Sequence, residues 1–414
     1  MATVRPFKAI RPAEEYASKV VALPYDVMNR QEAAEMAEGN PYSFLHISRA
    51  EIDLPEQENQ YDVSVYEKAK KNIDKYLEEG ILINEEKPAL YLYRQIMDGR
   101  VQTGIVGCVS VDEYRHNIIK KHELTRLEKE IDRINHFDVC DANTEPVFLT
   151  YRDDKRIRAI MEGFISGNEP VYDITAADGV QHILWVIDDE RIIAGLVSLF
   201  DELPAMYIAD GHHRSASACR VGERRQEETP GHTGDEEFNF FMAAIFPDSD
   251  LKIFDYNRVV KDLNGLDCEE FIEKVRTAGF EVEVLGEEAY YPEGKHIFSM
   301  YLEGKWYKLT ASESIVPEGV IEALDVSVLQ NSLLDPILGI KEPRIDKRID
   351  FVGGIRGLEE LKRRAESDMK VAFAVHPVEM SDLLEVADNN MIMPPKSTWF
   401  EPKLGSGLFM HSLK

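Results

Sequence analysis

The chain has 414 residues, more than one ordinary hydrophobic core requires, so two or three packed units are expected. Hydrophobic residues make up 44% of it, and 48 basic against 76 acidic residues give a net charge of −28. Because nucleic acids and anionic membranes are themselves negatively charged, this balance excludes them as general partners and favours small-molecule substrates.

Cysteine spacing and hydropathy indicate a soluble, cytoplasmic protein. The four cysteines lie far apart without a CxxC spacing, which argues against a zinc knuckle or a disulfide framework and predicts buried, reduced thiols: Cys108, Cys140, Cys219 and Cys268. The opening residues MATVRPFKAIRPAEEY contain no apolar signal-peptide core, and no later stretch approaches the roughly 20 apolar residues that a membrane helix needs.

Residues 1–85 are predicted to form an N-terminal lobe. It opens with two strand-like segments, RPFKAIRP and VVALPYDVM, and continues with helices at 30–38 and 61–79, the second of which stops at Gly80. Polar residues gather beside PYD and HISR in this lobe, and the sequence leaves open which of them face a cleft: Arg5, Tyr25, Asp26, His46, Ser48 and Arg49.

Residues 86–264 are predicted to form a central domain. Two hairpins are expected, at 90–111 around Asp98-Gly99 and at 170–188 around Asp178-Gly179, since both dipeptides favour tight turns. The remaining pattern predicts helices at 123–134, 153–165, 190–202 and from 211 to about 228, with strands at 146–151, 205–210, 238–246 and 251–260.

Residues 265–414 are predicted to form a C-terminal α+β domain. The pattern gives a helix at 269–278, a strand at 280–285, a hairpin at 296–311, helices near 326–333 and 356–366, a strand at 371–375, a helix at 380–387 and an irregular tail at 393–408. Strands and helices mix without steady alternation, so the predicted fold class is α+β, a mixed α/β arrangement.

The segment Asp210-Gly211-His212-His213-Arg214 ends a predicted strand and opens a predicted helix. Such a turn presents backbone N–H groups and the positive end of a helix to an anion. Gly211 permits close backbone approach, and Arg214 can hold a phosphate through two parallel hydrogen bonds. The alternative is an ordinary helix cap formed by Asp210. Adjacent helical histidines point about 100° apart and rarely chelate one ion, so Mg²⁺ held by Asp210 and phosphate oxygens is preferred to a zinc site.

His122 and Glu123 lie at a second junction between predicted elements. A carboxylate in that position can face a cleft and act as a general base, or orient a hydroxyl group. The charged run that follows, from Glu128 to Arg133, is predicted to be a solvated helix face with pairs at i,i+4 spacing.

The tail supplies further candidate hydrogen-bond donors to a phosphate, namely Lys396, Ser397, Thr398 and Lys403. It can equally be a structural strap held on a core by Trp399 and Phe400. No GxxxxGK[ST], GxGxxG, GxSxG or HExxH motif occurs, so the common nucleotide, serine-hydrolase and metalloprotease signatures are absent.

Taken in order, three motifs resemble the plan of the ParB/sulfiredoxin-like superfamily: His122-Glu123, Pro146-Val147-Phe148 and the turn 210–214. They resemble most its free-serine kinases, in which an HE glutamate, a PI strand and a DGHHR turn line one cleft. Over its full length, from RPFKAIRP through ALPYDV and NPYSFLHISR to MPPKSTWFEPK, the chain also resembles the family labelled domain of unknown function 1015.

The kinase resemblance implies a ParB/sulfiredoxin-like central domain and a phosphotransferase that makes O-phosphoserine from free L-serine with Mg²⁺. It implies that Glu123 is the base or orienting group and that the turn 210–214 binds the transferred phosphate. Without a Walker loop, pyrophosphate is the favoured donor, with ATP or ADP as alternatives. About 60 residues separate PVF from DGHHR, more than a compact version of this domain needs.

Other classes of function remain open. A ParB-like regulator that responds to nucleotides or nucleic acid conflicts with the net charge of −28. A sulfiredoxin-like reductase needs a cysteine in the phosphate turn, where this chain has none. A protein that binds a phosphorylated metabolite without turnover fits the same residues, and the sequence does not indicate an oligomeric state.

Overall fold

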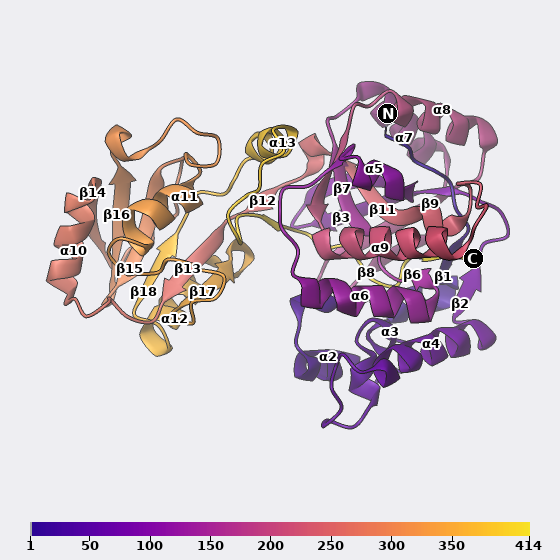
Figure 1. The fold of residues 1–414 in the computed structure, drawn as a ribbon, viewed down its shortest axis with the longest axis horizontal. Coiled ribbons are helices and arrows are strands. Elements are labelled where there is room, and N and C mark those ends of the chain that lie inside the picture. The colour runs from indigo at the N-terminus through magenta and orange to yellow at the C-terminus, as the bar shows by residue number, and fades with distance from the viewer. Residues whose placement is uncertain (1) are drawn as a thin grey trace. The chain divides into compact units, whose positions relative to one another are not determined.

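The computed structural model describes residues 2–414 and divides the chain into two compact units (Figure 1). Unit 1 comprises Met1–Leu251 and Pro402–Lys414, and unit 2 comprises Lys252–Glu401. This division differs from the three regions expected at 1–85, 86–264 and 265–414. The N-terminal and C-terminal segments both pair with strands of the central region, and the chain leaves unit 1 only at residue 252.

Unit 1 is built on an eight-stranded sheet of order β5-β10-β7-β11-β4-β3-β9-β8. Its neighbours are antiparallel except for two parallel pairs, β5 with β10 and β7 with β11. The strands are β3 (Leu90–Met97), β4 (Arg100–Ser110), β5 (Ile119–Lys120), β7 (Val147–Tyr151), β8 (Tyr172–Thr175), β9 (Gln181–Ile187), β10 (Met206–Asp210) and β11 (Phe240–Pro247).

A four-stranded sheet ties the two ends of the chain to this unit, with order β2-β1-β20-β6. Strand β20 (Met410–Ser412) lies between β1 (Ala9–Pro12) and β6 (Ala142–Asn143), and β2 (Leu82–Asn84) forms the edge beyond β1. Arg5 and Phe7 form further bridges to Cys108 and Ala89. The N-terminal region is therefore part of unit 1 and not a separate lobe.

Three long helices form one layer of unit 1 (Figure 1). Helix α9 (His212–Glu228) packs on α6 (Leu127–Cys140), and α6 packs on α4 (Val63–Glu78). The other helices of the unit are α1 (Ala17–Val20), α2 (Arg30–Ala37), α3 (Leu45–Ser48), α5 (Val111–Arg115), α7 (Lys155–Gly167), α8 (Glu190–Asp201) and the short η1 (Glu14–Tyr16), η2 (Tyr25–Val27), η3 (Ala50–Asp53), η4 (Glu237–Asn239) and η5 (Asp248–Asp250).

Unit 2 is built on an antiparallel six-stranded sheet of order β14-β16-β15-β18-β13-β17. Its strands are β13 (Tyr256–Val260), β14 (Phe280–Gly286), β15 (Ile297–Leu302), β16 (Lys305–Ala311), β17 (Ile349–Gly353) and β18 (Val371–Ala374), with a separate pair β12 (Ile253–Phe254) and β19 (Trp399–Phe400). Its helices are α10 (Cys268–Thr277), α11 (Asp325–Leu329), α12 (Gly357–Ser367), α13 (Met380–Asp388), η6 (Glu313–Ile315), η7 (Gln330–Leu334) and η8 (Gly354–Arg356).

The mixed architecture confirms the α+β fold class, and most expected elements are present. The hairpin at 90–111 turns at Asp98 and Gly99, which adopt the positive φ values of 52° and 80° that such a turn requires. The prediction of a strand at 20–28 was wrong, because this segment ends α1 and forms η2. The strands that were not expected are β2, β5, β6, β17, β19 and β20.

The expectation that Glu128–Arg133 is a solvated face was wrong for half of its residues. Glu130, Asp132 and Arg133 are buried, because α6 packs against both α4 and α9, whereas Glu128 and Ile131 remain exposed. The prediction of buried thiols is confirmed for Cys108, Cys140 and Cys219, whereas Cys268 is partly exposed. No helix within residues 2–414 has the length and apolar content to cross a membrane.

We expect Gly104→Ala to destabilise unit 1. A Cβ on Gly104 would lie 2.6 Å from the carbonyl oxygen of Ile245 and 2.8 Å from the ring of Phe246, so overpacking should lower the free energy of unfolding by about 1–3 kcal/mol. Gly163→Ala in α7 is the matched control, since its Cβ would meet nothing within 4 Å and should stabilise the helix by up to about 1 kcal/mol. Urea denaturation followed by circular dichroism measures both. Equal effects of the two substitutions would contradict this packing.

Candidate functional site

The turn after β10 is a strand-to-helix junction with glycine at its centre. Gly211 is the N-cap of α9 with φ 90° and ψ 31°, a left-handed conformation that disfavours other residues. A Cβ there would also lie 3.1 Å from Nε of Arg214. No side chain caps α9, and the Asp210 carboxylate instead accepts the N–H of Gly211 at 2.7 Å. The first turn of α9 thus retains N–H groups for an anion.

Asp210 forms an ion pair with Lys403, whose Nζ lies 3.0 Å from Oδ2. Burial raises the pKa of Asp210, but the positive charges of Lys403 and Arg214 outweigh it, so the pKa lies well below its usual range. Lys403 belongs to the segment that returns to unit 1 after unit 2, and its backbone carbonyl accepts a hydrogen bond from Gln95. The structure therefore brings Lys403, one of the candidate residues of the tail, to the turn.

Arg214 joins two of the three motifs. Its side chain is 3% exposed, and Nη1 donates to the carbonyl oxygen of Pro146 at 2.7 Å. Burial lowers the pKa of Arg214, but Asp26, Glu145 and Asp210 outweigh it, so the guanidinium stays charged. Its Nε has no hydrogen-bond partner among the described residues. A buried arginine donor without an acceptor is what an anion-binding site requires before its ligand arrives.

The two histidines of the turn hold the loop that precedes α6. Nε2 of His213 accepts the N–H of Arg126, the N-cap of α6, at 3.0 Å, and Nε2 of His212 lies 3.5 Å from the N–H of His122. Burial lowers the pKa of both rings, so they are neutral at pH 7 and only Nδ1 of each remains as a donor. Each histidine therefore has one N–H group that can donate a hydrogen bond to a phosphate.

His122 and Glu123 lie against this pair of histidines. The rings of His122 and His212 are 4.4 Å apart and nearly perpendicular, and Oε2 of Glu123 lies 3.9 Å from Nδ1 of His212. His122 is 1% exposed, neither of its ring nitrogens has a hydrogen-bond partner among the described residues, and burial lowers its pKa to about 4. The Glu123 side chain is 41% exposed, so a substrate can reach this carboxylate.

Buried charged residues that the motifs did not identify surround Arg214. Glu145 is 2% exposed and accepts a hydrogen bond from Ser406, and Arg133 stacks on the ring of Tyr25 at 4.0 Å. Tyr25 was among the polar residues of the N-terminal lobe, and Glu145 directly precedes the Pro146 motif. Arg133 carried no local signal, because its surroundings in the sequence are those of an exposed helix.

Other predicted residues belong to unit 2 or to the N-terminal region of unit 1. Lys396, Ser397 and Thr398 belong to unit 2, where Nζ of Lys396 sits 5.2 Å from the ring centre of Tyr256 and Ser397 donates to the carbonyl of Pro394. In the N-terminal region, Arg5 pairs with Glu237, and His46 pairs with Asp53.

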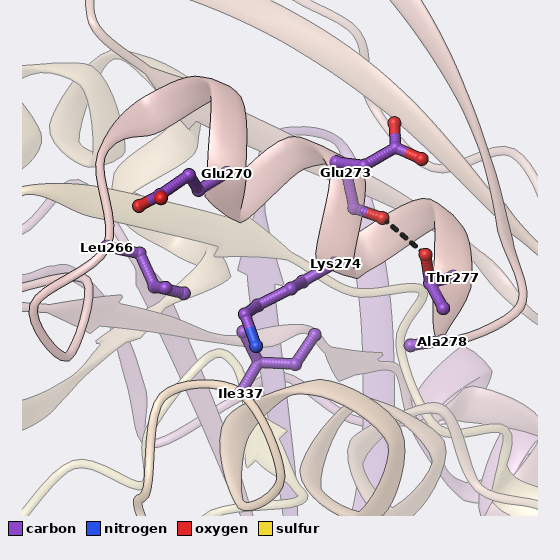
Figure 2. Close-up of a pocket in the computed structure, with 7 residues that line it drawn as sticks. All are labelled: Leu266, Glu270, Glu273, Lys274, Thr277, Ala278 and Ile337. Atoms are coloured by element: carbon purple, nitrogen blue, oxygen red, sulfur yellow. Dashed lines mark hydrogen bonds between the residues drawn. The ribbon is translucent and has the colours of Figure 1, made fainter.

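Unit 2 has an open depression along α10, lined by Leu266, Glu270, Glu273, Lys274, Thr277, Ala278 and Ile337 (Figure 2). The hydroxyl of Thr277 donates to the backbone carbonyl of Glu273, one helical turn earlier. None of the predicted site residues lines this depression.

The site in unit 1 combines an accessible carboxylate, a helix N-terminus and two cations, Arg214 and Lys403. Such an arrangement can accept a proton from a hydroxyl group and neutralise a phosphate. Among residues 2–414 there is no group of three or more His, Cys, Asp or Glu side chains that could hold a metal ion by themselves.

The fold and this site define an α+β protein with a glycine-centred strand-to-helix turn beside two cationic side chains, Arg214 and Lys403. The family model described as "Protein of unknown function (DUF1015)" matches residues 4–327, so the chain belongs to this family and the predicted resemblance is confirmed. No curated protein matches the chain.

Several solved structures are similar at low identity. A free serine kinase in complex with AMP is 14% identical with a TM-score of 0.38, covering 73% of this chain and 92% of the other. SbnI with a C-terminal truncation from Staphylococcus aureus is 12% identical with a TM-score of 0.40, covering 75% and 89%. A conserved hypothetical protein from Pyrococcus furiosus is 15% identical with a TM-score of 0.36, covering 73% and 95%. None of these similarities assigns a role to a residue of this chain.

Burial of neutral His122 should make unit 1 sensitive to acid. The unfolded chain takes up a proton on this ring near pH 6.5 and the folded chain only near pH 4, so the stabilisation is complete above pH 6.5 and is lost as the pH falls towards 4. The loss amounts to roughly 3 kcal/mol for this shift in pKa.

Urea denaturation between pH 7 and pH 4 measures this loss, and His122→Gln should flatten the pH dependence. His116→Gln, at an exposed site on the C-cap of α5, should leave the dependence as in the wild type. An unchanged slope in His122→Gln would rule out the buried neutral ring as its source.

Lys403→Met should weaken binding of an anion at the turn. The substitution removes a cation that pairs with Asp210 and leaves that carboxylate to repel a phosphate. Because hydrogen bonds to charged groups contribute about 1.5–3 kcal/mol, we expect the Kd for inorganic phosphate to rise about tenfold or more in calorimetric titrations. Lys87→Met, at an exposed site of the same unit, is the control and should bind as the wild type does.

Proposed function

We propose that this protein is a cytoplasmic phosphotransferase that transfers a phosphoryl group to the hydroxyl of free L-serine and forms O-phosphoserine. Pyrophosphate is the favoured donor, with ATP or ADP as alternatives. The observation that carries the proposal is that Oε2 of Glu123 lies 3.9 Å from His212, at the N-terminus of the helix that holds the buried Arg214. A potential base and an anion-binding turn therefore occupy one place.

In the proposed reaction, the hydroxyl oxygen of serine attacks the terminal phosphorus of the donor. Its proton passes to the Glu123 carboxylate, the new O–P bond forms, and the bond from phosphorus to the bridging oxygen breaks, so that orthophosphate leaves when pyrophosphate is the donor. Phosphoryl transfer depends mainly on positioning and on neutralisation of charge. Here, the N–H groups of α9, the guanidinium of Arg214 and the ammonium of Lys403 supply the neutralisation.

The residues present fit a Mg²⁺ ion that arrives with its phosphate donor. Mg²⁺ in such sites is held by one or two carboxylates together with substrate phosphates and water. Asp210 is ionised and half-buried at the turn, and is the carboxylate that we propose to hold the ion. When bound, the ion neutralises charge on the phosphate oxygens. Lys403 balances the charge of Asp210 before the donor binds.

A protein that binds a phosphorylated metabolite without turning it over is the second candidate function. The observation that favours it is the role of both turn histidines as acceptors of backbone N–H groups, which is structural and requires no chemistry. Tight binding of O-phosphoserine together with an absence of product from every donor would support this candidate.

Purified protein incubated with L-serine, Mg²⁺ and, separately, pyrophosphate, ATP or ADP should form O-phosphoserine with at least one donor, as measured by mass spectrometry. Glu123→Gln should lower kcat by about 100-fold or more, since a positioned general base contributes about 10²–10⁴-fold. Glu128→Gln, at an exposed site in the first turn of α6, is the matched control and should retain activity.

The assay tests the proposed reaction and the proposed role of Glu123 separately. If no donor yields phosphoserine, the proposed reaction is wrong. If phosphoserine forms and Glu123→Gln turns over at the wild-type rate, the reaction stands and the role of Glu123 is wrong.

A further inference from the structure

A second polar pocket lies in unit 1, between the segment formed by α3 and η3 and the helix α6. Its lining includes Ser48, Arg49, Tyr61, Lys129 and Arg133, none of which belongs to the proposed phosphotransfer site. The cavity is small, about 20 Å³, which is room for the centre of one water molecule. Ser48 and Arg49 are among the polar residues of the N-terminal lobe for which the motifs gave no role.

Two of these side chains have a buried polar atom with neither a hydrogen-bond partner nor an ion-pair partner among the described residues. Oγ of Ser48 and Nη1 of Arg133 make no hydrogen bond within residues 2–414, although the two residues are only 3% and 5% exposed. A buried group left in this state costs about 1–3 kcal/mol. Because an arginine N–H can only donate, the partner missing from Arg133 is an acceptor.

The pocket carries an excess of positive charge. Its lining contains three cations, from Arg49, Lys129 and Arg133, and two carboxylates. Each carboxylate is already paired, Glu51 with Arg49 at 2.9 Å and Asp132 with Arg133 at 2.9 Å. Lys129 has no carboxylate partner here and donates instead to the hydroxyl of Tyr61 at 3.2 Å. The lining also contains one histidine, His136, which is neutral because burial holds its pKa well below the usual value.

We propose that this pocket binds the oxyanion group, a carboxylate or a phosphate, of a small metabolite. Arg133 and Ser48 donate to the oxyanion, and Lys129 neutralises its charge. Gln60 and Tyr61 form the outer wall, on the segment between η3 and α4, and a guest larger than water displaces them.

The pocket borders the buried cluster around Arg214. Tyr25 lines the pocket and stacks on Arg133, and its phenol lies within electrostatic range of Arg214 and Glu145. An anion in the pocket therefore alters the field at the base of the DGHHR turn. Binding in the pocket stands independently of the proposed phosphotransfer.

Titration of the full chain with inorganic phosphate and, separately, with acetate tests the proposal by calorimetry at low salt. Ser48→Ala and Lys129→Gln should each weaken binding of at least one anion about tenfold or more. Lys71→Gln, at an exposed site of α4, is the matched control for Lys129→Gln and should bind as the wild type does. Ser48→Ala should leave the free energy of unfolding unchanged or raise it, because the hydroxyl that it removes has no partner.

Because phosphate is also expected at the turn beside Asp210, the titrations are repeated in Lys403→Met, which should weaken binding at the turn about tenfold or more and leave binding in the pocket unchanged. Binding of phosphate alone identifies phosphate esters as the guests, and binding of acetate alone identifies carboxylates. The proposal is overturned if the wild type binds neither anion, or if Ser48→Ala and Lys129→Gln both bind as the wild type does. Loss of phosphoserine formation with intact binding in the pocket contradicts only the proposed phosphotransferase.

Discussion

The hydrogen bond from Arg214 to the carbonyl of Pro146 is the interaction on which the site depends. It fixes the start of α9 to the start of β7, so that two motifs 68 residues apart meet at one point. A guanidinium buried to this degree is tolerated only with nearby acceptors and counter-charges. Asp26, Glu145 and Asp210 provide these charges, and they come from three different segments of the chain.

The histidines of the turn give the same region its rigidity. They accept backbone N–H groups from the loop that carries His122 and Glu123, and thereby hold that loop on α9. The same two histidines therefore place the Glu123 carboxylate close to the N-terminus of α9. Residues that look like ligands in the sequence act in the structure mainly as acceptors that place other residues.

Local patterns predicted the elements with strong periodicity or clear turn residues, such as the hairpin at Asp98-Gly99 and the strand that ends at Asp210. They failed where tertiary packing determines the burial of a side chain or the conformation of a segment. Arg133 reads as an exposed helical residue, but α6 is covered on two sides and the arginine is buried. Likewise, the segment 20–28 has the composition of a strand and yet contains the end of α1 and the short helix η2, because apolar composition alone does not set backbone conformation. The meeting of Lys403 with Asp210 is a contact across 193 residues, which a local pattern cannot reveal.

The return of residues 402–414 to unit 1 has a consequence for the order in which the protein can be assembled. During synthesis, β1 and β6 emerge early, but β20, which lies between them, emerges only after the whole of unit 2. Lys403 and Ser406 arrive with it. A nascent chain therefore holds an incomplete sheet and an Asp210 without Lys403 while unit 2 is synthesised, and the site becomes whole only after residues 402–414 have left the exit tunnel.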